Sequence, residues 1–126
     1  DTRAMDFKNG EFDCVIDKGT LDAILVIFLR NYPKIIVGEG SVTNAHKTLS
    51  EVHRVLAPKG VYILISYGIP EHRTQYLTKP EFGWELLPPV TVYKPTISTS
   101  ISLSNEDKDS PNYHYIYICR KVTKFI

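Results

Sequence analysis

The sequence predicts an α/β protein with a mixed β-sheet, and three observations support this class. Residues 12–17 form a short, β-branched apolar run that leads through a glycine turn into a helical pattern. Residues 61–65 form a second apolar run, directly after an amphipathic helical pattern. Residues 84–93 and 113–122 alternate apolar and polar side chains, as antiparallel strands do. Strand–helix–strand units imply parallel pairing, and the alternating strands add an antiparallel hairpin.

The first strand and the first helix follow from local pattern. After the strand at 12–17, residues from Thr20 to about Tyr32 are apolar nearly all round, which predicts a helix packed on more than one side. Pro33 ends this helix, and residues 35–40 are predicted to form a loop.

The second half of the strand–helix–strand unit has the clearest signals. Apolar residues recur at three- and four-residue spacing over 41–56, which predicts a helix with Ser41 as its N-cap. The turn at 58–60 stops the helix. The continuous apolar run at 61–65 is typical of a strand covered on both faces, and residues 71–78 are predicted to form a short helix.

The C-terminal third is predicted to hold a pair of strands joined by a long connection. Residues 95–112 are rich in Ser, Thr, Asp and Asn, so we expect a mobile insertion between the last two strands. The tyrosine-rich stretch 113–117 has no accompanying basic stripe. It is therefore expected to pack in the core and at the sheet edge, and not to stack on nucleic acid.

Chain length, net charge and cysteine content limit the kinds of partner and compartment that fit this chain. The 126 residues are enough for one domain with one modest core. A net charge of +1 argues against nucleic acid or a membrane surface as a partner. The apolar segment 24–29 is far shorter than the roughly 20 residues of a membrane-spanning helix. Cys14 and Cys119 both fall in strands predicted to be buried, so they are expected to be reduced core residues in a reducing compartment, the cytoplasm.

Three segments resemble the class I S-adenosylmethionine-dependent methyltransferases. They are residues 1–7, residues 12–23 with Asp-Lys-Gly-Thr-Leu-Asp at 17–22, and residues 49–60, which end in Arg-Val-Leu-Ala-Pro-Lys-Gly before a strand. The resemblance is narrowest to the branch that includes the elongation factor 1-alpha lysine methyltransferases. It implies a Rossmann-like mixed sheet of the class I methyltransferase type with an antiparallel C-terminal hairpin.

The sequence also departs from this family. The family has a glycine-rich loop after its first strand, where the backbone approaches the cofactor closely, and an acidic residue after its second strand. The glycines of this chain are scattered, and the chain begins at Asp1, without methionine, where the family's third strand ends. Residues 1–126 are thus expected to be a single partial domain, the C-terminal half, without its N-terminal strands.

Candidate site residues lie where ligands bind in open α/β sheets, past the carboxyl ends of parallel strands. Asp17 ends the first strand and is predicted to face the sulfonium of the cofactor or to orient a substrate amine; the alternative is an N-cap for the following helix. Lys18 is a candidate contact to cofactor or substrate. Tyr67 follows the next strand and could form a wall of the substrate channel, or simply pack as a loop aromatic.

The N-terminus supplies the remaining candidates through the resemblance. Asp1 falls where the family places an acidic residue on the adenine amino group, and the amide of Thr2 would donate to the ring. Asp22 is interpreted as a residue of the first helical turn, stabilised by the helix dipole. Arg73 resembles a position often filled by Arg in this branch, and we expect it to lie at the surface or to cap a helix. No metal-ligand pattern is present in the sequence.

The resemblance implies S-adenosylmethionine as cofactor and a protein lysine, for example one on a translation factor, as methyl acceptor. The isolated chain is expected to be inactive, because the cofactor-binding loop is absent from the sequence. The alternative is a non-catalytic half-domain that acts as a structural or interaction module and self-associates through its exposed sheet edge. A nicotinamide-dependent enzyme is a further alternative, but the sequence has no dinucleotide fingerprint.

Overall fold

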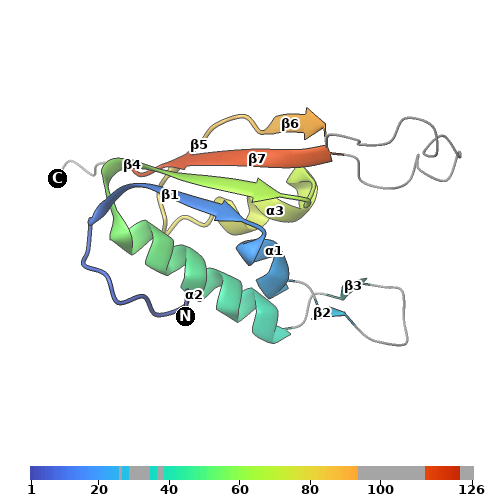
Figure 1. Cartoon of the computed structure of the whole chain (residues 1–126), viewed down its shortest axis with the longest axis horizontal. Coiled ribbons are helices and arrows are strands. Elements are labelled where there is room, and N and C mark those ends of the chain that lie inside the picture. The colour runs from blue at the N-terminus through green and yellow to red at the C-terminus, as the bar shows by residue number, and fades with distance from the viewer. Residues whose placement is uncertain (26, 29–34, 37–38, 94–112, 123–126) are drawn as a thin grey trace, which may run out of the picture.

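The computed structural model describes the chain except for residues 26, 29–34, 37–38, 94–112 and 123–126 (Figure 1). Its elements are β1 (Phe12–Lys18), α1 (Thr20–Leu25), β2 (Ile27–Phe28), β3 (Ile35–Ile36), α2 (Glu39–Val55), β4 (Leu56–Ser66), α3 (Pro70–Leu77), β5 (Glu85–Leu86), β6 (Val90–Tyr93) and β7 (Tyr113–Arg120). The main sheet has the order β1–β4–β7–β5, with β6 also paired to β7. Strands β1 and β4 are parallel, and β7 is antiparallel to β4. The predicted mixed α/β sheet with its antiparallel hairpin is confirmed.

One face of the sheet carries the core. Side chains of β4 and β7 on this face are buried against α1, α2 and α3. Tyr62 at the centre of β4 has no exposed surface and stacks on Trp84 at 5.7 Å between ring centroids. The indole Nε1 of Trp84 donates to the carbonyl of Leu77 at 2.5 Å, which ties the end of α3 to this core. The three helices therefore form one layer on one side of the sheet (Figure 1).

The first helix is shorter than predicted. It ends at Leu25, and residues 27–28 and 35–36 pair antiparallel as a separate two-stranded sheet. An apolar run has no period that distinguishes a buried helix from a strand, so the prediction of a helix up to Tyr32 was wrong in its extent. The predicted loop at 35–40 also contains the start of α2.

The boundaries of α2 differ from prediction at its start. The helix begins at Glu39, so Ser41 lies inside its first turn, 7% exposed, and is not the N-cap. At the other end, the ammonium of Lys121 donates to the carbonyls of His53 and Leu56, both at 2.7 Å. A lysine from the C-terminal segment thus satisfies carbonyls at the end of the helix.

The predicted strand at 84–93 is split into two. Strands β5 and β6 both pair with β7, and Pro88 and Pro89 lie between them. Proline has no amide to donate, so the ladder is interrupted there. The predicted insertion at 95–112 lies outside the described residues.

The second face of the sheet is exposed, although the apolar run at 61–65 predicted a strand covered on both faces. Val61, Ile63 and Ile65 of β4 are only half-buried, and Ile16 of β1 is 67% exposed. Cys14 lies on this face and is exposed, so the prediction that it is a core residue was wrong; Cys119 is buried as predicted. Both cysteines are free. The strand run is apolar on both sides, but the described helices cover only one of them.

Candidate functional site

The turn after β1 is built by one glycine and one carboxylate. Gly19 has φ +82°, a conformation that favours glycine, and it lets the chain turn from β1 into α1. The carboxylate of Asp17 accepts hydrogen bonds from the amides of Thr20 at 2.9 Å and Leu21 at 3.3 Å. Asp17 therefore caps the N-terminus of α1, which is the alternative that the sequence left open.

A buried tyrosine completes the environment of Asp17. The hydroxyl of Tyr62 donates to Asp17 Oδ2 at 2.8 Å, and Asp17 is only 8% exposed. Burial, and then the negative charge of Asp17, raise the pKa of Tyr62 well above its ordinary value, so this hydroxyl stays a donor. With three hydrogen bonds, the Asp17 carboxylate is held rigidly beneath the turn.

Asp22 joins the two neighbouring strand ends. Its Oδ2 accepts the amide of Tyr67 at 2.9 Å, and its Oδ1 accepts the hydroxyl of Ser66 at 2.5 Å. Ser66 and Tyr67 lie at the end of β4, whereas Asp22 lies in α1 after β1. One carboxylate thus fixes the loop after β4 against the turn after β1.

Arg73 of α3 also binds Asp22 and so adds the third helix to this bridge. Its Nε and Nη2 lie 3.1 Å from Asp22 Oδ1, and the side chains of Arg73 and Asp22 are 10% and 13% exposed. A Cβ on Gly68 would lie 2.4 Å from Arg73 Cζ, so this loop position requires glycine for close approach. The hydroxyl of Tyr117 on β7 donates to the Gly68 carbonyl at 2.5 Å, and burial raises the pKa of Tyr117 to about 12.

Two candidate side chains face outward at this edge. Tyr67 is 50% exposed and its ring lies 4.6 Å from the ring of His114 on β7. Lys18 is exposed and pairs in register with Ile65. The Asp22 bridge holds the Tyr67 backbone, so it fixes the point from which the Tyr67 ring projects.

The N-terminal candidates lie along α2. The Asp1 carboxylate accepts the Arg3 amide at 2.9 Å and forms an ion pair with its guanidinium at 2.7 Å. The hydroxyl of Thr2 lies 3.1 Å from the hydroxyl of Thr48. The guanidinium of Arg54 anchors the following segment by donating to the carbonyl of Met5 at 2.9 Å. These contacts order residues 1–9 against α2; they do not join Asp1 to Asp17.

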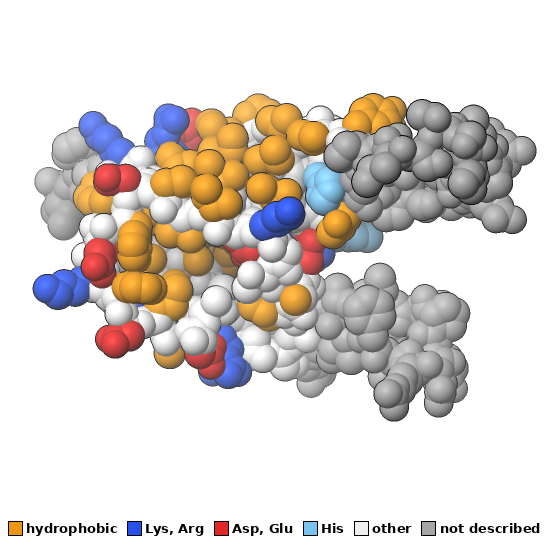
Figure 2. Space-filling model, in the orientation of Figure 1, with side chains coloured by type: hydrophobic (Ala, Val, Ile, Leu, Met, Phe, Trp, Pro, Cys, Tyr) orange, Lys and Arg blue, Asp and Glu red, His pale blue; other side chains and the backbone are white. Residues whose placement is uncertain are grey.

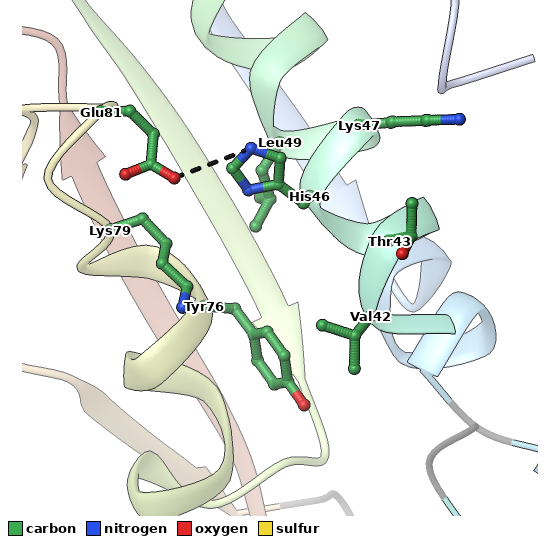
Figure 3. A pocket seen from close by; sticks show the side chains of 8 residues that line it. All are labelled: Val42, Thr43, His46, Lys47, Leu49, Tyr76, Lys79 and Glu81. Atoms are coloured by element: carbon green, nitrogen blue, oxygen red, sulfur yellow. Dashed lines mark ion pairs between the residues drawn. The ribbon is translucent and has the colours of Figure 1, made fainter. Parts of the chain in front are cut away.

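A pocket of about 340 Å³ lies elsewhere, between α2 and α3 (Figure 3). It is lined by the apolar side chains of Val42, Leu49 and Tyr76, and an ion pair joins His46 to Glu81 at 3.7 Å. None of the candidate residues at the strand ends lines it. In the part of the chain that the structure describes, no three His, Cys, Asp or Glu side chains group as metal ligands, and no helix is long and apolar enough to span a membrane.

Curated proteins give the decisive comparison. The chain is 40% identical over 86 residues to EEF1A lysine methyltransferase 4 of Bos taurus, which is 68% of this chain and 32% of that protein. It is 34% identical over 76 residues to the mitochondrial citrate synthase-lysine N-methyltransferase of Homo sapiens, covering 60% of this chain and 26% of that protein. The chain thus spans between about a quarter and a third of the length of these curated relatives.

The chain belongs to the class I S-adenosylmethionine-dependent methyltransferases. Solved structures share the fold: a methyltransferase in complex with the Trm112 activator of Haloferax volcanii has a TM-score of 0.63 at 10% identity, covering 100% of this chain and 60% of that one. A Thermus thermophilus protein complexed with S-adenosyl-L-methionine has a TM-score of 0.62 at 16% identity, covering 96% of this chain and 52% of that one. No protein-family model matches the chain.

The methyltransferase fold brings some predicted residues together and leaves others apart. Asp17 and Lys18 end β1, and Tyr67 follows β4, its paired neighbour, so these three share the carboxyl edge. Asp1 and Thr2 lie along α2 instead. The roles of all five in binding or catalysis remain predictions.

Sequence reasoning missed the two residues that organise this edge. Asp22 does lie in the first turn of α1, as the sequence predicts, but its bridging role is not apparent from the sequence. Arg73 is expected at the surface or as a helix cap, but it is 8% exposed and pairs with Asp22. Their separation of 51 residues hides the pairing from any local pattern. The available signal was the family resemblance at Arg73, together with a glycine five residues before it.

Proposed function

We propose that the complete domain to which this chain belongs transfers a methyl group from S-adenosylmethionine to a protein lysine, and that this chain supplies the acceptor side of the cleft. The observation that carries the proposal is the anchored edge at 17–22 and 66–68, in a chain 40% identical to a protein-lysine methyltransferase. The bovine relative is named for EEF1A, so a translation factor is the proposed protein substrate.

The residues of this edge have distinct proposed roles. Asp17, buried beneath the turn, is a positioning residue that fixes Lys18 and the start of α1. Tyr67 presents half of its surface and is the proposed wall against which an acceptor side chain lies. A sulfonium methyl group moves to an amine by direct displacement, which depends mainly on alignment of the two reactants. A rigid edge with one exposed aromatic ring fits that need.

The residues present do not form a complete cofactor site. The sequence has no glycine-rich loop, and the Asp1 carboxylate, proposed for the adenine, is engaged by Arg3. We therefore propose that the isolated chain binds S-adenosylmethionine weakly or not at all and is inactive alone. Isothermal titration calorimetry of the isolated chain tests this, and binding at micromolar concentration would contradict it.

A chimera tests the activity. In it, this chain replaces the aligned segment of the bovine relative, and methyl transfer to EEF1A is measured with labelled S-adenosylmethionine. We expect transfer to lysine, and a decrease in kcat/KM of at least about tenfold for Tyr67→Ala because the acceptor is no longer aligned. Ile69→Ala, at a nearby residue that is 38% exposed, is the matched control. A chimera that folds and binds the cofactor but methylates no protein lysine would refute the proposal.

A second candidate function is that of a non-catalytic interaction module. It is favoured by the uncovered sheet face and by β1, which among the described residues pairs only with β4. On this proposal the isolated chain self-associates through that edge. Multi-angle light scattering over a range of concentrations tests it, and a monomer at the highest concentration would count against it.

A further inference from the structure

The pocket between α2 and α3 has an apolar floor that the core leaves open. Leu49 is 1% exposed and lines the pocket from α2, and Tyr76 lines it from α3, half-buried. Val42 belongs to the same apolar stripe of α2 as Ala45 and Leu49, but it is 41% exposed. Figure 3 shows Val42 and Tyr76 reaching into the same space from the two helices. The apolar stripe of α2 thus continues beyond the core into the pocket.

This pocket is separate from the open face of the sheet. Figure 2 shows hydrophobic side chains gathered over the strands, whereas α2 and α3 lie in the helical layer that covers the opposite face. A ligand in the pocket would therefore contact helices and not the strand surface.

Two buried aromatic rings hold the walls of the pocket in place. Phe82 and Trp84 follow α3 in the chain and are 3% and 9% exposed. The Phe82 ring lies 5.3 Å from the ring of His46, and the Trp84 ring lies 5.6 Å from that of His53, both on α2. These contacts fix the segment after α3 against α2. The pocket is therefore formed in advance, so binding does not have to order its walls.

The rim of the pocket is open to solvent. The side chains that line it include four exposed polar residues, Thr43, Lys47, Lys79 and Glu81. Small-molecule sites bury about 70–90% of their ligand, which an open rim does not achieve. A volume of about 340 Å³ over an apolar floor can instead receive one large apolar side chain that enters from outside. We therefore look for the occupant among protein segments.

The charges at the rim favour an acidic partner. Glu81, the single carboxylate among the described lining residues, lies 3.7 Å from His46. Lys47 and Lys79 form no ion pair with any residue that the structure describes. Figure 3 shows Lys79 directed toward Tyr76 and Lys47 directed away from the pocket. Lys79 is thus the cation within reach of a bound segment.

We infer that the pocket between α2 and α3 binds an acidic segment of a partner protein, which inserts one large apolar side chain between Val42 and Tyr76 and places a carboxylate on Lys79. Burial of the apolar side chain supplies most of the affinity, because an exposed ion pair adds little. The charge selects the sign of the partner and speeds its association. The inference rests on the pocket alone and does not require the proposed methyl transfer.

NMR titration of the nitrogen-15-labelled chain with short peptides tests the inference. The peptides are Glu-Asp-Phe-Asp-Glu, the same peptide with Ser in place of Phe, and Lys-Lys-Phe-Lys-Lys. We expect the acidic Phe peptide to bind at least about tenfold more tightly than the Ser peptide, because only Phe buries a large apolar surface. It should also bind more tightly than the Lys peptide, by a margin that shrinks as salt is added. Amide shifts should change around Val42, His46 and Lys79, and not at Lys18 or Tyr67.

Matched substitutions locate the contact. Lys79→Glu should weaken binding of the acidic Phe peptide and strengthen binding of the Lys peptide, a reversal that a folding defect does not produce. Lys59→Glu makes the same charge change at an exposed lysine outside the pocket and should leave both affinities unchanged. Val42→Ser should weaken binding of the acidic Phe peptide at least about threefold. Val92→Ser, at a position 40% exposed on β6, is its control and should have no effect.

Four results would each overturn the inference. One is equal affinity for the Phe and Ser peptides, and another is an equal response of Lys79→Glu and Lys59→Glu. A third is binding of 3-phenylpropionate as tight as that of the acidic Phe peptide, which would make the pocket a small-molecule site. The fourth is a change of the pocket's amide shifts with protein concentration in the absence of peptide, which would identify the occupant as a second copy of this chain.

Discussion

Replacing Asp22 by alanine should destabilise the fold more than any other single change at the candidate site. The Asp22 carboxylate accepts from Ser66, from the Tyr67 amide and from the Arg73 guanidinium, and the Asp22 and Arg73 side chains are 13% and 10% exposed. Removing one partner of a buried ion pair costs about 3–5 kcal/mol, because the other charge stays desolvated. We expect about 3 kcal/mol, the lower end, since both side chains retain some contact with water.

A double-mutant cycle separates the ion pair from the other contacts of Asp22. Arg73→Met leaves Asp22 with two donors, so it should cost less than Asp22→Ala, about 1–2 kcal/mol. In the double variant no charge is left unpaired, so the combined loss should fall short of the sum by about 2 kcal/mol. Trp84 is the single tryptophan and is 9% exposed, so its fluorescence reports urea unfolding at protein concentrations too low for association.

The reasoning would be refuted by either of two results. One is a loss below about 1 kcal/mol for Asp22→Ala, the size of an ordinary exposed contact. The other is strict additivity in the cycle, which would mean that Asp22 and Arg73 do not interact in solution. Asp13→Ala removes an exposed carboxylate from β1 and is the matched control, with a change expected within about 0.5 kcal/mol.

Three further predictions follow from other buried contacts. Gly68→Ala should lower the urea midpoint, because the new Cβ would lie 2.4 Å from Arg73 Cζ; an unchanged midpoint would show that the loop relaxes freely. Burial raises the pKa of Cys119 to about 12, so the thiol stays protonated in the folded state, and the free energy of unfolding should fall as the pH rises from about 9 towards 12. Cys119→Val should flatten this pH dependence, and equal pH dependence in the variant and the original chain would exclude the thiol as its source. Asp17→Ala removes an N-cap and leaves the Tyr62 hydroxyl unpaired, so it should lower thermal stability. In the complete protein it should lower methyl transfer by more than the decrease in the folded fraction accounts for, and equal losses of activity and thermal stability would assign Asp17 to capping alone.

Local patterns predicted most of the fold. The alternation of the C-terminal strands, the apolar stripe of α2 and the turn at Gly19 depend on residues close in sequence, and each element exists where the pattern indicated. The predicted ends of two elements were wrong. The apolar residues 27–28 are equally compatible with a helix or a strand, so the first helix was predicted too long, and two prolines split the strand predicted at 84–93. The prediction that Cys14 is buried was wrong because the burial of a strand residue depends on what covers the strand, and the residues of the strand do not specify this.

By itself, the sequence determined the class of this protein, because strand–helix–strand order and the residues at 17–22 and 54–60 are local properties. Only the tertiary structure decided how the candidate edge is held together. The pairing of Asp22 with Arg73 links residues 51 positions apart, and the contact of Tyr62 with Asp17 links residues 45 apart. Such contacts form only after the sheet and helices have packed, since packing removes these polar groups from water and makes their partners obligatory. The bare face of β1 and β4 is likewise a property of the assembled sheet, because identical apolar runs are buried or exposed according to what lies above them.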